Sequence, residues 1–157
     1  MYNLRKIRGT LKGSVGEAIF ISIKNHTHAT KFDSYEWLNK LNHLEIPKKI
    51  LNFLKANWAT IDVFEFIVQG NFVTNLILYE IKTLNNYSSK GINFGRKPVI
   101  TQNSLNFYLA ALNHGYIVKS VYVILYDNWE FDINVNDFLP RNFNVWDGNP
   151  KYSKAAI

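Results

Sequence analysis

The spacing of hydrophobic and polar positions changes along the chain, and each change marks an expected element. Apolar residues recur at helical spacing over Leu11–Lys24 and again over Ser34–Trp58. The segments Thr60–Gln69 and Val73–Leu84 are instead rich in β-branched and aromatic residues, which is typical of strands. Because only the short segment Gly70–Phe72 separates these two segments, they predict an antiparallel hairpin.

The second half of the chain predicts a further helix and two further strands. A helix is expected after Thr101, with Gly115 at its end and with the apolar stripe Leu105, Tyr108, Leu109 and Leu112. Val118–Tyr126 predicts a strand, and Glu130–Val135 is expected to pair with it. We therefore expect one α+β domain over residues 1–157, in which helices flank a small mixed sheet and the chain is irregular from about residue 141.

Three charged residues interrupt the apolar pattern of the hairpin. Glu80 and Lys82 lie two positions apart, so both project from the same face of their strand. Asp62, in the partner strand, is as far from Asn71 along the sequence as Glu80 is. A three-residue loop at 70–72 therefore places Asp62 directly opposite Glu80 on the same face. A two-residue turn would shift the register by one and turn Asp62 to the other face.

Two opposed carboxylates repel each other unless a cation lies between them. Mg²⁺ or Mn²⁺ would be held by Asp62 and Glu80, and positions would remain for water and for a phosphate oxygen. Lys82 would then orient the attacking water or stabilise the developing negative charge. The alternative interpretation is a cross-strand salt-bridge cluster without catalytic function. If the register differed, Glu65 would take the place of Asp62 as a ligand.

The segments Ile61-Asp62 and Glu80-Ile81-Lys82 resemble the two motifs of the PD-(D/E)xK nuclease superfamily, over about residues 10–126. The resemblance implies a restriction-endonuclease-like core, similar to that of Holliday-junction resolvases, and metal-dependent hydrolysis of phosphodiester bonds in DNA. It also implies that Glu17 in the first helix binds the metal and that Gln102 assists catalysis. Glu17 is otherwise interpreted as a solvated helix residue.

One departure from this family pattern concerns the first strand of the core. No strand is evident between the first helix and Asp62, because Ser34–Trp58 has a helical pattern. The sequence therefore predicts a reduced or divergent version of the fold. By its length and overall character the chain also resembles the small nucleases of filamentous archaeal viruses.

The charge of the chain favours a polyanionic partner. The net charge is +6 and the pI is near 9.4, and the basic residues gather in the first 31 residues and between residues 85 and 125. This segregation predicts one positive face for DNA, double-stranded or branched, with contacts from Arg5, Arg8, Lys12, Lys90, Arg96 and Lys97. The loop that carries the last three residues is either a phosphate-binding segment or an ordinary solvated loop. A non-catalytic DNA-binding or packaging protein would use the same face.

Several other classes find no support in the sequence. The chain has no cysteine, which excludes disulfides and thiolate chemistry, and it lacks the GxxxxGK[ST] motif of P-loop proteins. His26 and His28 have no third ligand nearby in the sequence and are interpreted as solvated. No apolar run is long enough to span a bilayer, so we expect a soluble, intracellular protein without a membrane partner, in the host cytoplasm if it is viral. A homodimer is compatible with these observations, although no segment indicates its interface.

Overall fold

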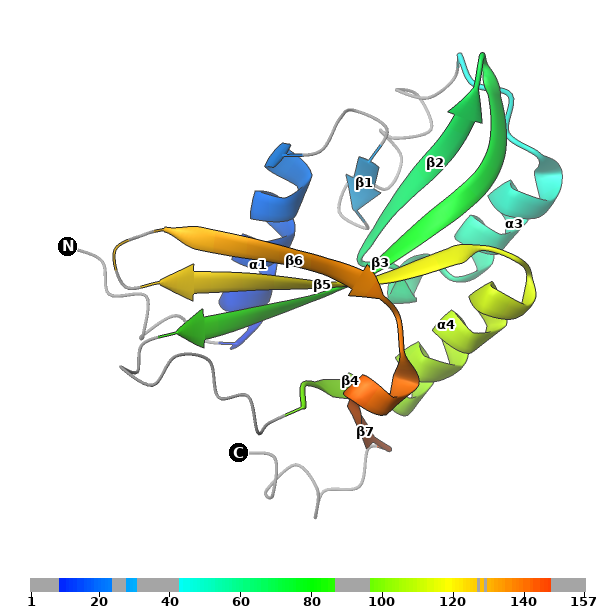
Figure 1. Ribbon diagram of the computed structural model, residues 1–157. Coiled ribbons are helices and arrows are strands. Elements are labelled where there is room, and N and C mark those ends of the chain that lie inside the picture. The colour runs from blue at the N-terminus through cyan, green and yellow to red at the C-terminus, as the bar shows by residue number, and fades with distance from the viewer. Residues whose placement is uncertain are drawn as a thin grey trace.

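A five-stranded mixed sheet, with the strand order β1-β2-β3-β5-β6, organises the chain in the computed structural model (Figure 1). The structure describes residues 9–23, 28–30, 43–86, 97–126, 128 and 130–147. The strands of this sheet are β1 (His28–Thr30), β2 (Val63–Gln69), β3 (Phe72–Asn86), β5 (Ile117–Tyr126) and β6 (Phe131–Asp137). Only β3 and β5 are parallel, and the other neighbouring pairs are antiparallel.

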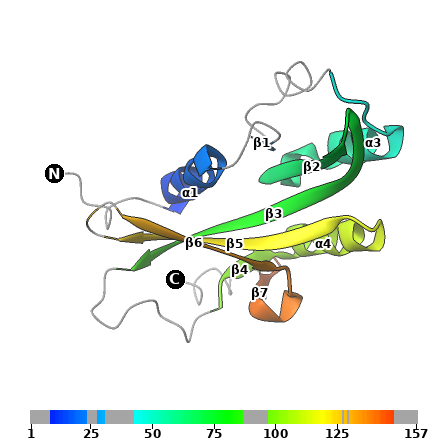
Figure 2. The same ribbon diagram turned by 45° about the horizontal axis from the view of Figure 1, so that its top comes forward.

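The helices cover both faces of the sheet. They are α1 (Gly9–Ile23), α3 (Lys48–Ala56) and α4 (Gln102–Asn113), with single 3₁₀ turns at Trp58–Thr60 and Pro140–Asn142. A second, two-stranded sheet pairs β4 (Val99–Thr101) in parallel with β7 (Asn144–Trp146). Figure 2 shows α1 and α4 on opposite sides of the sheet. The α+β class predicted from the sequence is confirmed, while the likeness to a restriction-endonuclease core stays a prediction.

Strand β3 contributes to two hydrophobic cores because its side chains alternate between the faces of the sheet. Leu76 and Leu78 join the core beneath α3 and α4, whereas Tyr79 and Ile81 join the core beneath α1. Phe20 of α1 is fully buried in this second core. The alternation thus places Glu80 and Lys82 on the α4 face of the sheet.

The hairpin formed by β2 and β3 keeps the predicted register by a different route. Gln69 pairs with Phe72, so the turn contains only Gly70 and Asn71, and the three-residue loop predicted from the sequence is wrong. A β-bulge then leaves Thr74 as an extra residue between the pairs Val68↔Val73 and Ile67↔Asn75. From Ile67 back to Val63 the pairing follows the predicted register. Because Val63 pairs with Tyr79, the next position before β2 is Asp62, and the next position along β3 is Glu80.

The turn of this hairpin is held by the segment that precedes α3. The backbone N–H of Glu45 donates to the carbonyl of Asn71 at 2.7 Å, and the N–H of Val73 donates to the carbonyl of Glu45 at 2.9 Å. The helical pattern predicted over Ser34–Trp58 is interrupted at residues 43–47, where the chain is not helical, and α3 begins directly after Pro47. The first part of the pattern falls on residues that the structure does not describe.

Three further expectations are corrected. The strand that the sequence did not reveal between the first helix and Asp62 is present as β1, which pairs with β2. The tail expected to be irregular contains β7. On α4 the buried residues are Phe107, Tyr108 and Ala111, whereas Leu109 and Leu112 of the predicted stripe are 40% and 41% exposed. The predicted stripe differs from the buried face because only part of the apolar surface of α4 packs against the core.

The ends of α4 agree with the sequence. Thr101 is the N-cap, and its hydroxyl oxygen accepts a hydrogen bond from the backbone N–H of Ser104 at 3.2 Å. Gly115 follows the helix with a φ of 83°, a left-handed conformation that favours glycine. Among the described residues, no helix has the length and apolar character needed to cross a bilayer.

The close packing of α1 on β3 at Gly16 generates a first prediction. A Cβ atom at Gly16 would overlap the side chain of Thr83. Gly16→Ala should therefore lower the free energy of unfolding by about 1–3 kcal/mol through overpacking, whereas the same change at an open helix position would raise it by about 1 kcal/mol. Urea denaturation measures this difference. Thr83→Ala in the same chain should restore part of the loss, and a stabilised Gly16→Ala variant would contradict the packing described here.

Candidate functional site

The candidate site is built around Glu80, a carboxylate in the interior of β3. The residue is only 5% exposed, and its strand position is paired with Ser120 of the parallel strand β5. On the other side β2 begins at Val63, opposite Tyr79, so none of the described strand pairs covers that edge of β3 from Glu80 onward. A charged group so deeply buried is costly unless it is paired.

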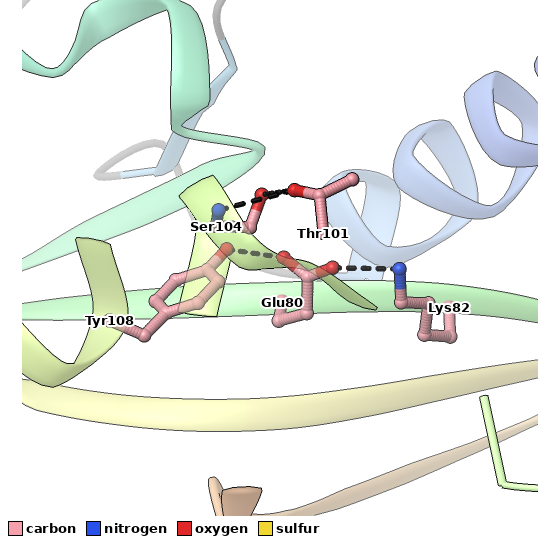
Figure 3. Close-up of polar contacts among 5 residues, drawn as sticks. All are labelled: Glu80, Lys82, Thr101, Ser104 and Tyr108. Carbon is pink, nitrogen blue, oxygen red and sulfur yellow. Dashed lines mark hydrogen bonds and ion pairs between the residues drawn. The ribbon is translucent and has the colours of Figure 1, made fainter. Parts of the chain in front are cut away.

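Both oxygens of Glu80 are engaged, as Figure 3 shows. The hydroxyl of Tyr108, from α4, donates a hydrogen bond to Oε2 of Glu80. The Nζ atom of Lys82 lies 2.9 Å from Oε1. The two partners differ in exposure, since the Lys82 side chain is 26% exposed and Tyr108 is 1% exposed. Glu80 therefore lies between a buried neutral donor and a cation that reaches solvent.

The pKa of Tyr108 depends on the charges of the other acids predicted for the site. Burial raises the pKa of Tyr108 well above its ordinary value, and the negative charges of Glu80, Asp62 and Glu17 raise it further, as does the hydrogen bond to Glu80. The hydroxyl therefore stays protonated and donates. Carboxylates from α1, from the bend before β2 and from β3 are all close enough to act on this one hydroxyl.

The way each acid reaches this region follows from its element. Asp62 lies in the bend directly before β2, one position beyond the last strand pair, which joins Val63 to Tyr79. Glu17 lies on α1, directly after the glycine that allows this helix to approach Thr83 of β3.

The acids of this region do not form a complete metal cage. Within the part of the chain that the structure describes, no group of three His, Cys, Asp or Glu side chains is arranged to hold a metal ion. A hard divalent cation commonly takes one or two protein carboxylates together with water and phosphate. Glu80 and Asp62, whose charges act more strongly on Tyr108 than that of Glu17, are the candidates to hold such a cation.

Gln102, the polar residue predicted to assist catalysis, does not face Glu80. Its Nε2 atom donates to Oδ1 of Asn106 at 2.9 Å on the exposed side of α4. The residue of α4 that reaches the site is Tyr108, which the sequence had assigned to an apolar stripe. A buried tyrosine hydroxyl needs a hydrogen-bond partner, and this requirement was the only sequence signal available.

Two hydroxyls bond to each other at the beginning of α4. The hydroxyl of Thr101 donates to Oγ of Ser104 at 2.9 Å, as Figure 3 shows. Ser104 is one helical turn before Tyr108, so both side chains lie on the same side of α4. The sequence identified Thr101 only as a helix cap.

The predicted DNA-binding residues fall mostly outside the described residues. Arg5, Arg8, Lys90 and Arg96 lie there, and Lys12 is described only as a backbone position in α1. Lys97 is exposed and precedes β4, which leads directly into Thr101 and α4. Glu65 lies on the α1 face, where it accepts a hydrogen bond of 2.6 Å from the hydroxyl of Tyr79, so it does not replace Asp62.

The pairing of Lys82 with Glu80 generates a second prediction. Lys82→Met removes the counter-charge of a buried carboxylate, so the free energy of unfolding should fall by about 1–3 kcal/mol at neutral pH. The matched control is Lys119→Met, because Lys119 pairs with the exposed Asp137 and such pairs contribute about 1 kcal/mol or less. Urea denaturation of both variants tests this, and equal losses would show that Lys82 does not neutralise Glu80.

Comparison with known proteins finds no relative of this chain. No family model, no curated protein and no solved structure matches the chain. The function of the site therefore has to be inferred from the chemistry of its own residues.

Proposed function

We propose that the protein is a metal-dependent nuclease that hydrolyses phosphodiester bonds in DNA. The observation that carries the proposal is the buried carboxylate of Glu80, which is paired with Lys82 two residues away and bonded to the hydroxyl of Tyr108. The charges of Asp62 and Glu17 act on the same hydroxyl, and a buried carboxylate of this kind favours a function that uses its negative charge.

The residues fit Mg²⁺ or Mn²⁺ by the chemistry of their donors. Carboxylate oxygens are the ligands that these cations prefer, and Asp62 and Glu80 supply them from adjoining positions of the hairpin. When bound, the cation supplies positive charge to the scissile phosphate and lowers the pKa of water.

The other side chains have roles that follow from their positions. Lys82 is partly exposed, so its ammonium group can reach a phosphate or orient the attacking water while its stem stays in the strand. The hydroxyls of Thr101 and Ser104 are suited to contact phosphate oxygens beside Glu80. Lys97 and the other residues predicted to bind DNA would hold the backbone of the nucleic acid.

The rival function is a DNA-binding or packaging protein without catalysis. Such a protein needs a basic face, but it gains nothing from a buried carboxylate that is held by a tyrosine and a lysine. The Glu80 arrangement therefore favours the nuclease, and the two functions differ in whether DNA is cut.

The test is cleavage of linear and branched DNA with Mg²⁺ or Mn²⁺ and with EDTA. The parent should cut only with metal, and Glu80→Ala and Asp62→Ala should lower the rate at least about a hundredfold, since the charge at the phosphate is worth several kcal/mol. Binding of DNA, measured by fluorescence anisotropy, should persist in both variants.

Glu65→Gln is the matched control, because Glu65 is also bonded to a tyrosine, on the opposite face of the sheet. This variant should cut at the parent rate. If Glu80→Ala and Asp62→Ala cut as well as the parent, the proposed centre is wrong. If the parent binds DNA but never cuts it, the packaging function is correct instead.

A further inference from the structure

Tyr108 is more deeply buried than Lys82, the other partner of Glu80 that the structure describes. Its ring packs against Phe107 and Phe138, with centroids 5.0 Å and 5.1 Å away, and the whole side chain is 1% exposed. These contacts join α4 to the segment that follows β6. The hydroxyl consequently has a fixed position relative to β3.

Packing constrains the side chain of Lys82 less than that of Tyr108. Its side chain is long, unbranched and partly exposed, and its ammonium group can exchange Glu80 for water or phosphate without unpacking a core. The contact between Lys82 and Oε1 can therefore be replaced, whereas the contact between Tyr108 and Oε2 cannot be broken without moving α4.

We propose that Tyr108 is a positioning residue that fixes Oε2 of Glu80, so that Oε1, released by Lys82, is the oxygen presented to the divalent cation. This inference rests on the proposed nuclease function and names a determinant of metal binding within that site. Tyr108 contacts neither the metal nor DNA. It acts by holding one orientation of the Glu80 carboxylate. When the cation replaces Lys82 at Oε1, Lys82 becomes free to contact the phosphate.

The arrangement has a physical advantage for a buried ligand. A carboxylate that rotates freely loses conformational entropy when it binds a cation, and a fixed hydrogen bond removes that cost beforehand. A neutral donor also leaves the negative charge of Glu80 in place for the cation. A second lysine at the position of Tyr108 would neutralise that charge and compete with the metal.

The experiment is a titration of the protein with Mn²⁺ in the absence of DNA. Electron paramagnetic resonance measures the concentration of free Mn²⁺ at each point. In Tyr108→Phe the Mn²⁺ dissociation constant should rise by about tenfold or more, because partners of metal ligands typically change affinity by that factor. The Mn²⁺ concentration for half-maximal DNA cleavage should rise in parallel, while the rate at saturating Mn²⁺ falls less.

Two matched controls separate positioning from packing. Tyr79→Phe removes a tyrosine–carboxylate bond on the opposite face of the sheet, and Tyr116→Phe removes a buried hydroxyl that has no partner among the described residues. Both should bind Mn²⁺ like the parent. Thermal unfolding shows whether each variant is folded, and Tyr108→Trp, which keeps a buried ring with a donor in a different place, should not restore affinity.

The outcomes distinguish the inference from the function on which it rests. If folded Tyr108→Phe binds Mn²⁺ as tightly as the parent while the parent cuts DNA, positioning by Tyr108 is wrong and the nuclease function stands. If Tyr79→Phe weakens Mn²⁺ binding as much as Tyr108→Phe, the effect is one of packing and the inference is also overturned. A parent that neither binds Mn²⁺ nor cuts DNA overturns the proposed function itself.

Discussion

The burial of Glu80 in the interior of β3 is the constraint on which the rest of the structure depends. Removing a carboxylate from water is costly, and here the cost is offset by one neutral donor and one cation. Those partners have to come from two places, Tyr108 from α4 and Lys82 from the same strand. The position of α4 against the sheet is therefore linked to the charge of one side chain, and a site of this kind cannot be built on the hairpin alone.

The strand pattern was the most predictable part of the fold. The register between β2 and β3 agrees with the prediction, although the turn that was expected to produce it does not. Alternation of apolar residues locates β2 and β3, and only one register buries both of their apolar faces. The turn itself followed a different rule, because Gly70-Asn71 forms a two-residue connection. The extra residue at Thr74 restores the register, and a bulge has no strong signature in a single sequence.

The parts that the sequence did not reveal depend on contacts between distant segments. β1 has three residues, too few for a period to be visible, and it exists because β2 offers an edge. Tyr108 was placed among apolar residues since its ring does pack in the core, and only the structure shows where its hydroxyl points. Gln102 has the expected polarity and the expected helix, but its orientation follows the exposed side of α4. For Tyr108 and Gln102 the sequence predicts the helix that carries them, but it does not predict which way their side chains point.

One strand sets the geometry of the candidate site on both of its faces. The alternation that directs Glu80 and Lys82 toward α4 directs Ile81 and Thr83 toward α1. Thr83 leaves room for no side chain at position 16, so Gly16 allows α1 to come close, and Glu17 follows directly. Packing on the face of β3 opposite to Glu80 thus sets how closely α1, the helix that carries Glu17, lies against the strand.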